Sequence, residues 1–251
     1  MNLLKTLLDH LPSGKVISVD VGLFWTVVVV ETATGIRCGL AATLHNPELE
    51  HADAPAVRQA GHLEKLTARQ LAEGVSSSSW LEVSIGLAAI NALLPPPPKT
   101  EKLAAEDYIA RQGAHSRVAL IGHFPFVERL RQQVAELWVL ELNPRPGDLP
   151  ATQAEQVIPQ ADILAITATT LINGTFDRLF ALRRPASKVL LLGPSTPLSP
   201  LLFDHGIHVL SGVIVKDIEA VRDLARQGAT FRQIKKGGVE LVTLEAPVGQ
   251  G

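Results

Sequence analysis

The sequence predicts an α/β protein in two parts: a small α+β domain over residues 1–98, then a Rossmann-like, doubly wound parallel sheet over residues 99–251. Short apolar runs alternate with helical segments after residue 117, and buried parallel strands are typically continuous apolar runs. Alternation of strands and helices is typical of a doubly wound sheet. The prolines at 95–98 end the preceding helix and form a stiff spacer, which sets the boundary.

The composition supplies a core and argues against some partners. Apolar residues make up 46% of the 251 residues and aromatic residues only 4%, so Leu, Val, Ile and Ala must fill the interior. A net charge of −2 without a basic patch argues against nucleic acid as a partner. Cys38 is the single cysteine, which excludes an intrachain disulfide and fits a reducing cytoplasm.

The apolar segments do not indicate a membrane partner. Residues 1–11 predict an amphipathic helix that is interrupted by Asp9 and His10, unlike a signal peptide. The apolar run over 21–30 is too short to span a bilayer. We therefore expect a cytoplasmic protein. A homodimer is compatible with the apolar composition, although no particular residue indicates one.

In the first region, three Val-rich segments separated by turn signals predict an antiparallel meander. Its strands are expected over residues 15–19, 24–31 and 37–43. Leucines at helical spacing predict a helix over 63–73. A second helix over 80–94 is apolar almost all round, which predicts a buried helix.

The second region should contain six strands with helices between them. The strands are expected over residues 118–121, 137–140, 163–166, 188–192, 208–215 around Gly212, and 239–244 at an edge. The helices are expected over residues 126–135, 154–159, 172–182, 200–205 and 218–227. Ligands bind outside the carboxyl ends of the strands in such sheets, so these ends should carry the site.

The turn after the first of these strands reads Gly-His-Phe-Pro. A dinucleotide site would carry Gly-x-Gly-x-x-Gly there, whereas only Gly122 is present, which argues against NAD. The His123 side chain is a candidate ligand, acid or base, and the alternative is a residue that only begins a helix.

Two features follow the second strand. Glu141 comes 19 residues after Gly122, a spacing typical of the carboxylate that holds a ribose hydroxyl, although many strands end in a carboxylate. The loop over 143–150 contains three prolines. They would pre-order Asn143 and Asp148 for binding, or the loop is only a connection.

The third strand is followed by Thr167, Thr169, Thr170 and Asn173. Such residues cap helices and also suit a polar or anionic ligand at a helix start. Gly193, Ser195 and Thr196 follow the fourth strand in the same geometric role, and Gly212 would allow close approach to the backbone.

A polar segment over 45–53, with His62 beyond it, contains imidazoles and carboxylates that could bind a divalent metal. It lacks a standard ligand spacing, so a solvated loop is the alternative. No Gly-x-Ser-x-Gly motif supports a nucleophilic serine.

Several motifs resemble one family. The sequences GHFPF, NPRPGDLP, TTLIN and GPSTPLSP, within 118–200, are similar to the DUF364 family, whose members are labelled as heavy-metal chelation proteins. The segment 79–94 resembles the closing helix of the amino-terminal domain that precedes that module, and this domain resembles the capping domain of enolases. The resemblance implies an enolase-like domain packed on a Rossmann-like domain, with a site in the cleft between them.

We expect the chain to bind a small polar or anionic ligand, or a heavy metal or metal complex, in that cleft. The alternative is an enzyme acting on a small molecule there, with His123 as the general acid or base and a nucleotide-type cofactor or divalent metal. The predicted lining consists of Gly122, Phe124, Glu141, Asn143, Asp148, Thr169, Thr170, Asn173, Gly193, Ser195 and Thr196.

Overall fold

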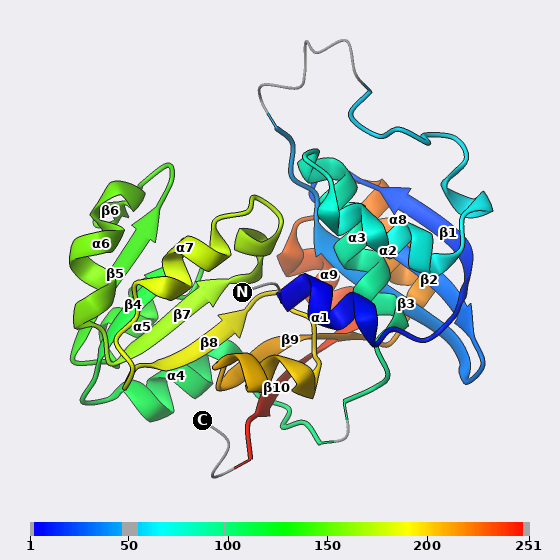
Figure 1. Ribbon diagram of the computed structural model, residues 1–251. Helices are drawn as coiled ribbons and strands as arrows, with labels where there is room; N and C mark the ends of the chain where they lie inside the picture. Colours follow the sequence, from blue (N-terminus) through cyan, green and yellow to red (C-terminus); the bar gives the residue numbers. More distant parts are fainter. Residues whose placement is uncertain (1–2, 47–54, 98, 248–251) are drawn as a thin grey trace.

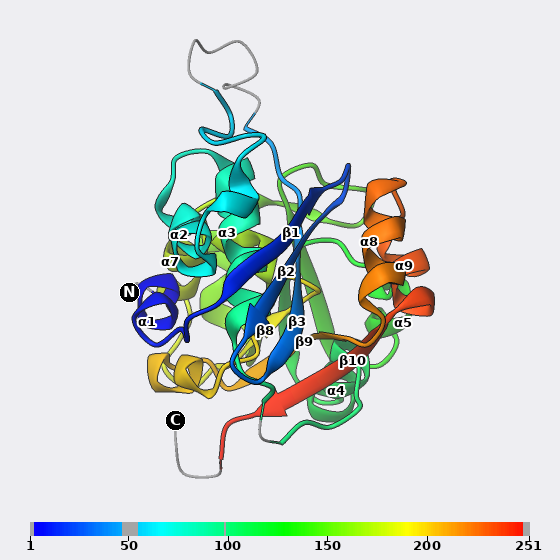
Figure 2. The ribbon, with the colours of Figure 1, turned by 90° about the vertical axis from the view of Figure 1, so that its right-hand side faces the viewer.

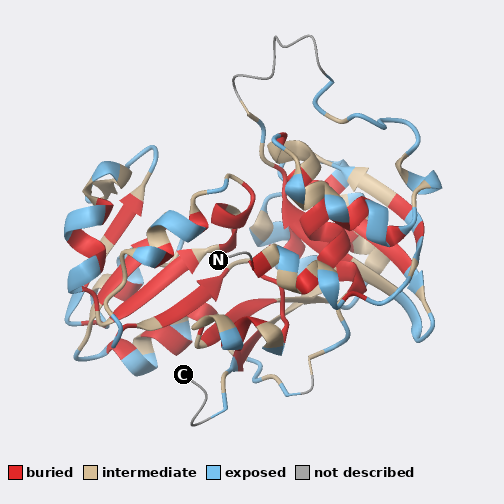
Figure 3. Ribbon diagram, in the orientation of Figure 1, coloured by how far each residue is buried: buried red, intermediate tan, exposed pale blue. Residues whose placement is uncertain are grey.

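The computed structural model describes residues 3–46, 55–97 and 99–247 and contains two separate sheets (Figure 1). A three-stranded antiparallel sheet belongs to the first region, and a seven-stranded, mostly parallel sheet belongs to the second. Buried residues concentrate in the strands of both sheets and in helix α3 (Trp80–Leu93) (Figure 3). The predicted α/β class is confirmed.

The first region forms the predicted meander. Its strands run in the order β1-β2-β3, and helix α1 precedes them. Their bounds are α1 Leu3–Asp9, β1 Lys15–Val21, β2 Trp25–Thr32 and β3 Gly35–Ala42. Helix α3 (Trp80–Leu93) packs on β2 and β3, and ten of its fourteen residues are buried, as its continuous apolar sequence predicts.

The predicted single helix over 63–73 is wrong. A 3-10 turn over Leu63–Lys65 is followed by a separate helix α2 (Ala68–Ala72). Thr67 lies between them in an extended conformation, and its side chain accepts a hydrogen bond from the N–H of Gln70. This capping box starts a new helix and prevents one continuous helix.

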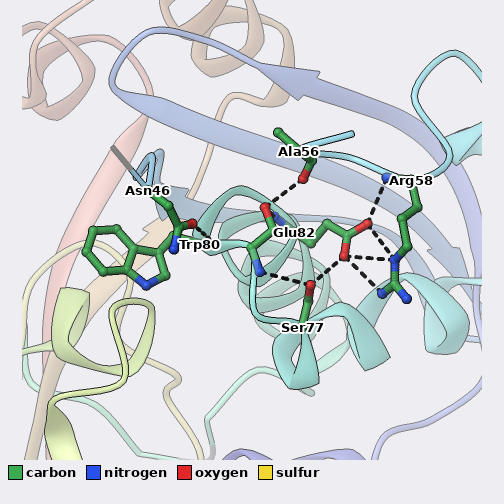
Figure 4. A network of polar contacts seen from close by, with 7 residues as sticks. Asn46, Ala56, Arg58, Ser77, Trp80 and Glu82 are labelled. Atoms are coloured by element: carbon green, nitrogen blue, oxygen red, sulfur yellow. Dashed lines mark hydrogen bonds and ion pairs between the residues drawn. The ribbon is translucent and has the colours of Figure 1, made fainter. Parts of the chain in front are cut away.

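Polar contacts hold the segments beside residues 47–54 against the start of α3 (Figure 4). Asn46 Oδ1 accepts the N–H of Trp80, and Ser79 Oγ donates to the carbonyl of Ala56 at 2.6 Å. The guanidinium of Arg58 forms a two-point ion pair with Glu82. Burial alone would raise the pKa of Glu82, but Arg58 and Ser77 lower it overall.

The large sheet has the strand order β10-β9-β8-β7-β4-β5-β6. Only β10 is antiparallel, and it pairs with β9. The six predicted strands are present with small changes in bounds, and the short β6 was not predicted. The bounds are β4 Arg117–Ile121, β5 Glu136–Glu141, β6 Leu149–Pro150, β7 Ile163–Thr167, β8 Lys188–Leu192, β9 Val209–Val215 and β10 Val239–Glu245.

Helices cover both faces of this sheet, as in a doubly wound fold. Side chains of α4 and α5 share a core with alternate residues of β4, β5 and β7. The other face is covered by α6, α7 and a 3-10 helix. The bounds are α4 Ala105–Gly113, α5 Val127–Arg131, α6 Ala154–Val157, α7 Phe176–Ala181 and Pro200–His205 for the 3-10 helix.

Three predicted helices are too long, and two helices of the second region were not predicted. The helix expected over 126–135 ends at Arg131, where 3-10 hydrogen bonds from Gln132 and Gln133 close the last turn. The helix expected over 154–159 ends at Val157 and continues as a 3-10 turn. The helix expected over 172–182 begins at Phe176, after a loop that the Asn173 side chain stabilises. Helix α4 and the helix over Phe231–Gly237 were not predicted.

The small sheet lies between α3 on one face and helices α8 (Ile218–Arg226) and α9 (Phe231–Gly237) on the other (Figure 2). The Nε of Arg222 and the Nε of Arg226 each donate a hydrogen bond to the Asp20 carboxylate at 2.8 Å. These two contacts join α8 to β1. Packing therefore crosses the boundary expected near residue 98, and the division into two domains stays a prediction.

Candidate functional site

The chain reverses its direction across the large sheet between β4 and β7. From β4 it continues to β5 and β6 on one side and then crosses to β7 on the other. Loops leave such neighbouring strands toward opposite faces and create a crevice. At Gly122 the backbone has φ = 101°, and an added Cβ would lie 3.2 Å from Thr167 Cγ2. The positive φ therefore favours glycine at this position, and a larger residue would also fit tightly against Thr167.

A cavity of about 350 Å³ opens at this position, at the carboxyl ends of β4, β5 and β7. It brings together seven predicted site residues, namely Gly122, His123, Phe124, Glu141, Thr169, Thr170 and Asn173. We call it the polar pocket. All of its lining lies between residues 121 and 179, so the first region contributes nothing to it, although the predicted site lay between the two regions.

The His123 ring is fixed in the polar pocket by a buried carboxylate. Its Nδ1 lies 2.8 Å from Asp148 Oδ2, and the Asp148 side chain is fully buried. The same oxygen accepts the N–H of Arg145, and Arg131 lies 3.9 Å from the other oxygen. If the carboxylate oxygen accepts from Nδ1 in this contact, Nε2 of a neutral imidazole has a free lone pair. Among the described residues Nε2 has no hydrogen-bond partner.

Glu141 stabilises the two loops beside His123. One carboxylate oxygen accepts the N–H of His123 and the other accepts the N–H of Leu142, both at 2.8 Å. A carboxylate that accepts two backbone N–H groups orders the backbone around it. Glu141 lines the pocket as predicted, but its oxygens already hold the loops that follow β4 and β5.

The loop after β7 presents a fixed amide. Asn173 Oδ1 accepts hydrogen bonds from the N–H and the hydroxyl of Thr175, at 3.2 and 2.7 Å. Because a backbone N–H can only donate, this atom must be the amide oxygen. The NH₂ group of Asn173 has no partner in the described part of the chain. Thr167 caps the 3-10 turn Ala168–Leu171, so the prediction of a cap in this loop is confirmed.

The pocket also contains Thr175 and Arg178, which the sequence reading missed as site residues. Thr175 follows Asn173 by two residues, the spacing of an Asx turn, and this signal could have identified it. Arg178 lies on α7, where an exposed arginine gives no distinguishing signal; its guanidinium pairs with Glu155 at 3.0 Å.

Four predicted residues lie elsewhere. Ser195 and Thr196 are buried where β3 meets the loop after β8, and Ser195 Oγ accepts the N–H of Ala42 at 2.8 Å. Gly193 lines a different cavity, and Asn143 is exposed outside the polar pocket. The residues that were expected to line one cleft are thus divided between separate places in the structure.

Metal-binding side chains do not cluster in the described structure. Over residues 3–46, 55–97 and 99–247, no group of three His, Cys, Asp or Glu residues is placed to hold a metal ion. Burial raises the pKa of Cys38 to about 12, so its thiol is neutral and a poor metal ligand. Of the predicted segment 45–53, only His45 and Asn46 fall inside the described residues.

No helix in the described ranges has the length and apolar character needed to cross a membrane. The cytoplasmic location, the homodimer and the absence of a nucleic-acid partner stay predictions.

Known proteins resemble this chain along most of its length. An uncharacterized protein of Methanocaldococcus jannaschii is 26% identical over 240 residues, which cover 92% of this chain and 90% of that protein. A crystal structure of a DUF364 protein of unknown function from Desulfitobacterium hafniense matches with a TM-score of 0.79 and 27% identity, covering 97% of this chain and 98% of the other. A DUF364 protein from Pyrococcus horikoshii, also of unknown function, shares the fold with a TM-score of 0.79, 23% identity and coverage of 96% and 97%.

Family models account for both regions. Residues 4–94 match DUF4213, and residues 105–243 match DUF364; both are described as "Putative heavy-metal chelation". The likeness of the first region to the enolase capping domain stays a prediction. The match over residues 105–243 covers more than half of the chain, which therefore belongs to the DUF364 family.

Proposed function

We propose that the chain binds a small polar or anionic molecule in the polar pocket. The observation that supports this most is a pair of fixed groups that have no partner among the described residues. They are the NH₂ of Asn173 and Nε2 of His123, in one cavity of about 350 Å³. Groups held in place by neighbours lose little entropy on binding. A carboxylate or phosphate oxygen would accept from Asn173, and a hydroxyl of the ligand would donate to Nε2 of His123. The hydroxyls of Thr170 and Thr175 already donate within the chain, so they can only accept from a ligand.

The family description implies a heavy metal, and the described donors do not fit a bare ion. Soft metals prefer thiolates, and the only thiol in the chain is neutral and lies outside the polar pocket. The pocket supplies one imidazole nitrogen, amide and hydroxyl groups, and a carboxylate already occupied by backbone N–H groups. A metal bound here would arrive as a complex that brings most of its ligands with it.

A second candidate function is catalysis, and the contact between His123 and Asp148 favours it. A buried carboxylate that fixes Nδ1 leaves Nε2 able to take a proton from a substrate and return it. The same arrangement of an imidazole and a carboxylate orients the base in many hydrolases. In this alternative the ligand of the polar pocket is converted, with His123 as the general acid or base.

The binding proposal can be tested by thermal-shift titration with small carboxylates, phosphates, free divalent metals and their citrate complexes. A ligand present at 100 times its Kd stabilises the native state by about 2.7 kcal/mol. In a domain of this size that raises Tm by roughly 5–10 °C. At least one anion or complex should do so, and a bare metal ion should not.

The variant Asn173→Asp is the sharpest test. It keeps an oxygen for Thr175 but replaces the NH₂ donor with a second negative oxygen, so the shift in Tm should disappear. Asn143→Asp adds the same charge outside the pocket and should keep the shift. An unchanged response in Asn173→Asp, or no response to any compound, would refute the proposal.

Catalysis is tested by incubating the bound compound with the chain and analysing the products. Turnover should be abolished in His123→Gln and retained in His115→Gln. His115 is exposed and precedes the amino end of β4, whereas the pocket lies at the carboxyl end of that strand. Recovery of the compound unchanged would exclude the enzymatic alternative and leave the binding proposal intact.

A further inference from the structure

A second and larger cavity, of about 650 Å³, lies between the two regions. Its walls come from the start of β2, the first turn of α4, the loop after β4, helix α5, the end of β8 and the loop after it, the middle of β9, helix α9 and β10. We call it the aromatic pocket. It meets the polar pocket at Phe124, which lines both cavities.

Aromatic side chains are concentrated here. The chain has only eleven of them, three Trp, one Tyr and seven Phe, and four line this cavity. Phe124 and Phe126 stack with their ring centres 5.0 Å apart and their planes 17° apart. Trp25 and Phe231 form a tilted pair at 5.5 Å. Two ring pairs from different elements thus border one space.

Ordinary core packing does not account for this arrangement. Protein interiors are packed closely and leave few voids larger than a water molecule. Here the rings border an open hollow large enough for a small organic ligand, and apolar hollows of this size are typical of ligand sites. Flat rings offer stacking surfaces, which favours a planar aromatic partner.

The charges at this cavity favour an anion. Three cationic residues line it, Arg129, Arg232 and Lys235, against one acid, Glu106. Arg129 already lies 3.5 Å from Glu106 and 3.3 Å from Asp107. Arg232 and Lys235 are exposed, lie three residues apart on α9, and form no ion pair within the described ranges. Residues at this spacing face the same side of a helix and can hold one anionic group together.

We infer that the aromatic pocket binds a planar aromatic molecule that carries a carboxylate or phosphate. The ring lies against the aromatic pairs, and the anionic group lies toward Arg232 and Lys235. The site is separate from the polar pocket and does not rest on the function proposed for that pocket.

Titration calorimetry with naphthalene-2-carboxylate and 2-naphthyl phosphate tests this inference, with naphthalene-2-carboxamide as the neutral analogue. One equivalent of at least one anion should bind, and it should quench Trp25 in a chain carrying Trp80→Phe and Trp138→Phe. The anion that binds more tightly identifies the group preferred. The neutral analogue should bind at least about fivefold more weakly, because it lacks the attraction to the two cations.

The double variant Arg232→Gln and Lys235→Gln changes two exposed residues and should fold normally. It should lower the affinity for the anionic probe on the order of five- to tenfold and leave the affinity for the neutral analogue unchanged. The matched variant Lys65→Gln and Arg69→Gln removes two cations elsewhere and should change nothing. Phe124→Leu should lower the affinity for both the anionic probe and the neutral analogue, because it removes a stacking surface.

The substitutions His123→Gln and Asn173→Asp distinguish the two pockets, because they should leave the probes unaffected. Equal binding of anionic and neutral probes, an unaltered affinity in the double variant, or no saturable binding below about 1 mM would each overturn the inference.

Discussion

The hydroxyl of Ser195 accepts the backbone N–H of Ala42 at 2.8 Å, and both groups are buried. Ala42 lies at the end of β3, whose outer edge has no neighbouring strand. Asn91 supports the same contact, since its amide donates to the carbonyls of Leu40 and Ser195. The side chains of Ser195 and Asn91 thus form hydrogen bonds with backbone groups of β3 at the open edge of the sheet. These contacts join that edge to the loop after β8.

Ser195→Ala should therefore destabilise the chain, although Ser195 was predicted as a ligand contact. It leaves the buried N–H of Ala42 without an acceptor, which costs about 1–3 kcal/mol. In a domain of this size Tm should fall roughly 2–4 °C for each kcal/mol. Ser199→Ala is the matched control, because that buried serine makes no side-chain hydrogen bond within the described residues. Equal Tm values for the two variants would contradict the assignment.

Gly39→Ala should be among the most damaging small substitutions. A Cβ at this position of β3 would lie 2.0 Å from the carbonyl oxygen of Ala88 and 2.3 Å from the N of Ala92. Both are backbone atoms of α3, so the helix itself must move, at a cost of about 3 kcal/mol or more. At Gly113 the closest atom is a methyl of Val134 at 3.0 Å, which can rotate away. In urea denaturation, the free energy of unfolding should fall by that amount for Gly39→Ala and change by less than about 1 kcal/mol for Gly113→Ala.

Glu141→Gln should remove one of the two backbone hydrogen bonds that order the polar pocket, while the side chain keeps nearly the same size and shape. A glutamine has one oxygen for two backbone N–H donors, so its NH₂ must face the N–H of either His123 or Leu142. Losing one hydrogen bond to a charged acceptor costs about 1.5–3 kcal/mol. The imidazole signals of His123 in NMR spectra should also shift. Glu136→Gln, at the exposed start of β5, should affect neither stability nor those signals.

Stability should decrease between about pH 7 and pH 5 because of His208. Burial, aided by the charges of Lys188 and Arg183, lowers the pKa of His208 below the ordinary value of 6.5. Its Nδ1 accepts the N–H of Val189 at 3.0 Å, which requires a neutral ring. The unfolded chain takes up this proton near pH 6.5 and the folded chain only at lower pH, so the stabilisation is complete above 6.5 and is lost below it.

The variant His208→Asn provides the control, because it retains an acceptor near Nδ1 and cannot take up a proton. Its Tm should vary less between pH 7 and pH 5 than that of the parent chain. If Tm depended on pH in the same way in the two proteins, His208 would not take up a proton on unfolding, and the prediction would be wrong.

Parts of the fold that depend on local sequence were predictable. Most strands of the large sheet are buried on both faces, and this leaves continuous apolar runs such as the one from Val189 to Leu192 in β8. Helix α9 was missed, although Thr230 and Gln233 form a capping box that would have indicated its start. Helix α4 begins without a side-chain cap and is largely polar outside its buried face, so its local signal is weak.

The residues after β4, β5 and β7 could be expected at one edge of the sheet, because parallel strands share their carboxyl ends, and most of them do line the polar pocket. Other relationships were fixed only by tertiary structure. Ser195 meets Ala42 across 153 residues, and Trp25 meets Phe231 from the opposite end of the chain. Local sequence carries the period and the turn chemistry of each element, whereas which distant side chains become neighbours depends on how whole elements pack.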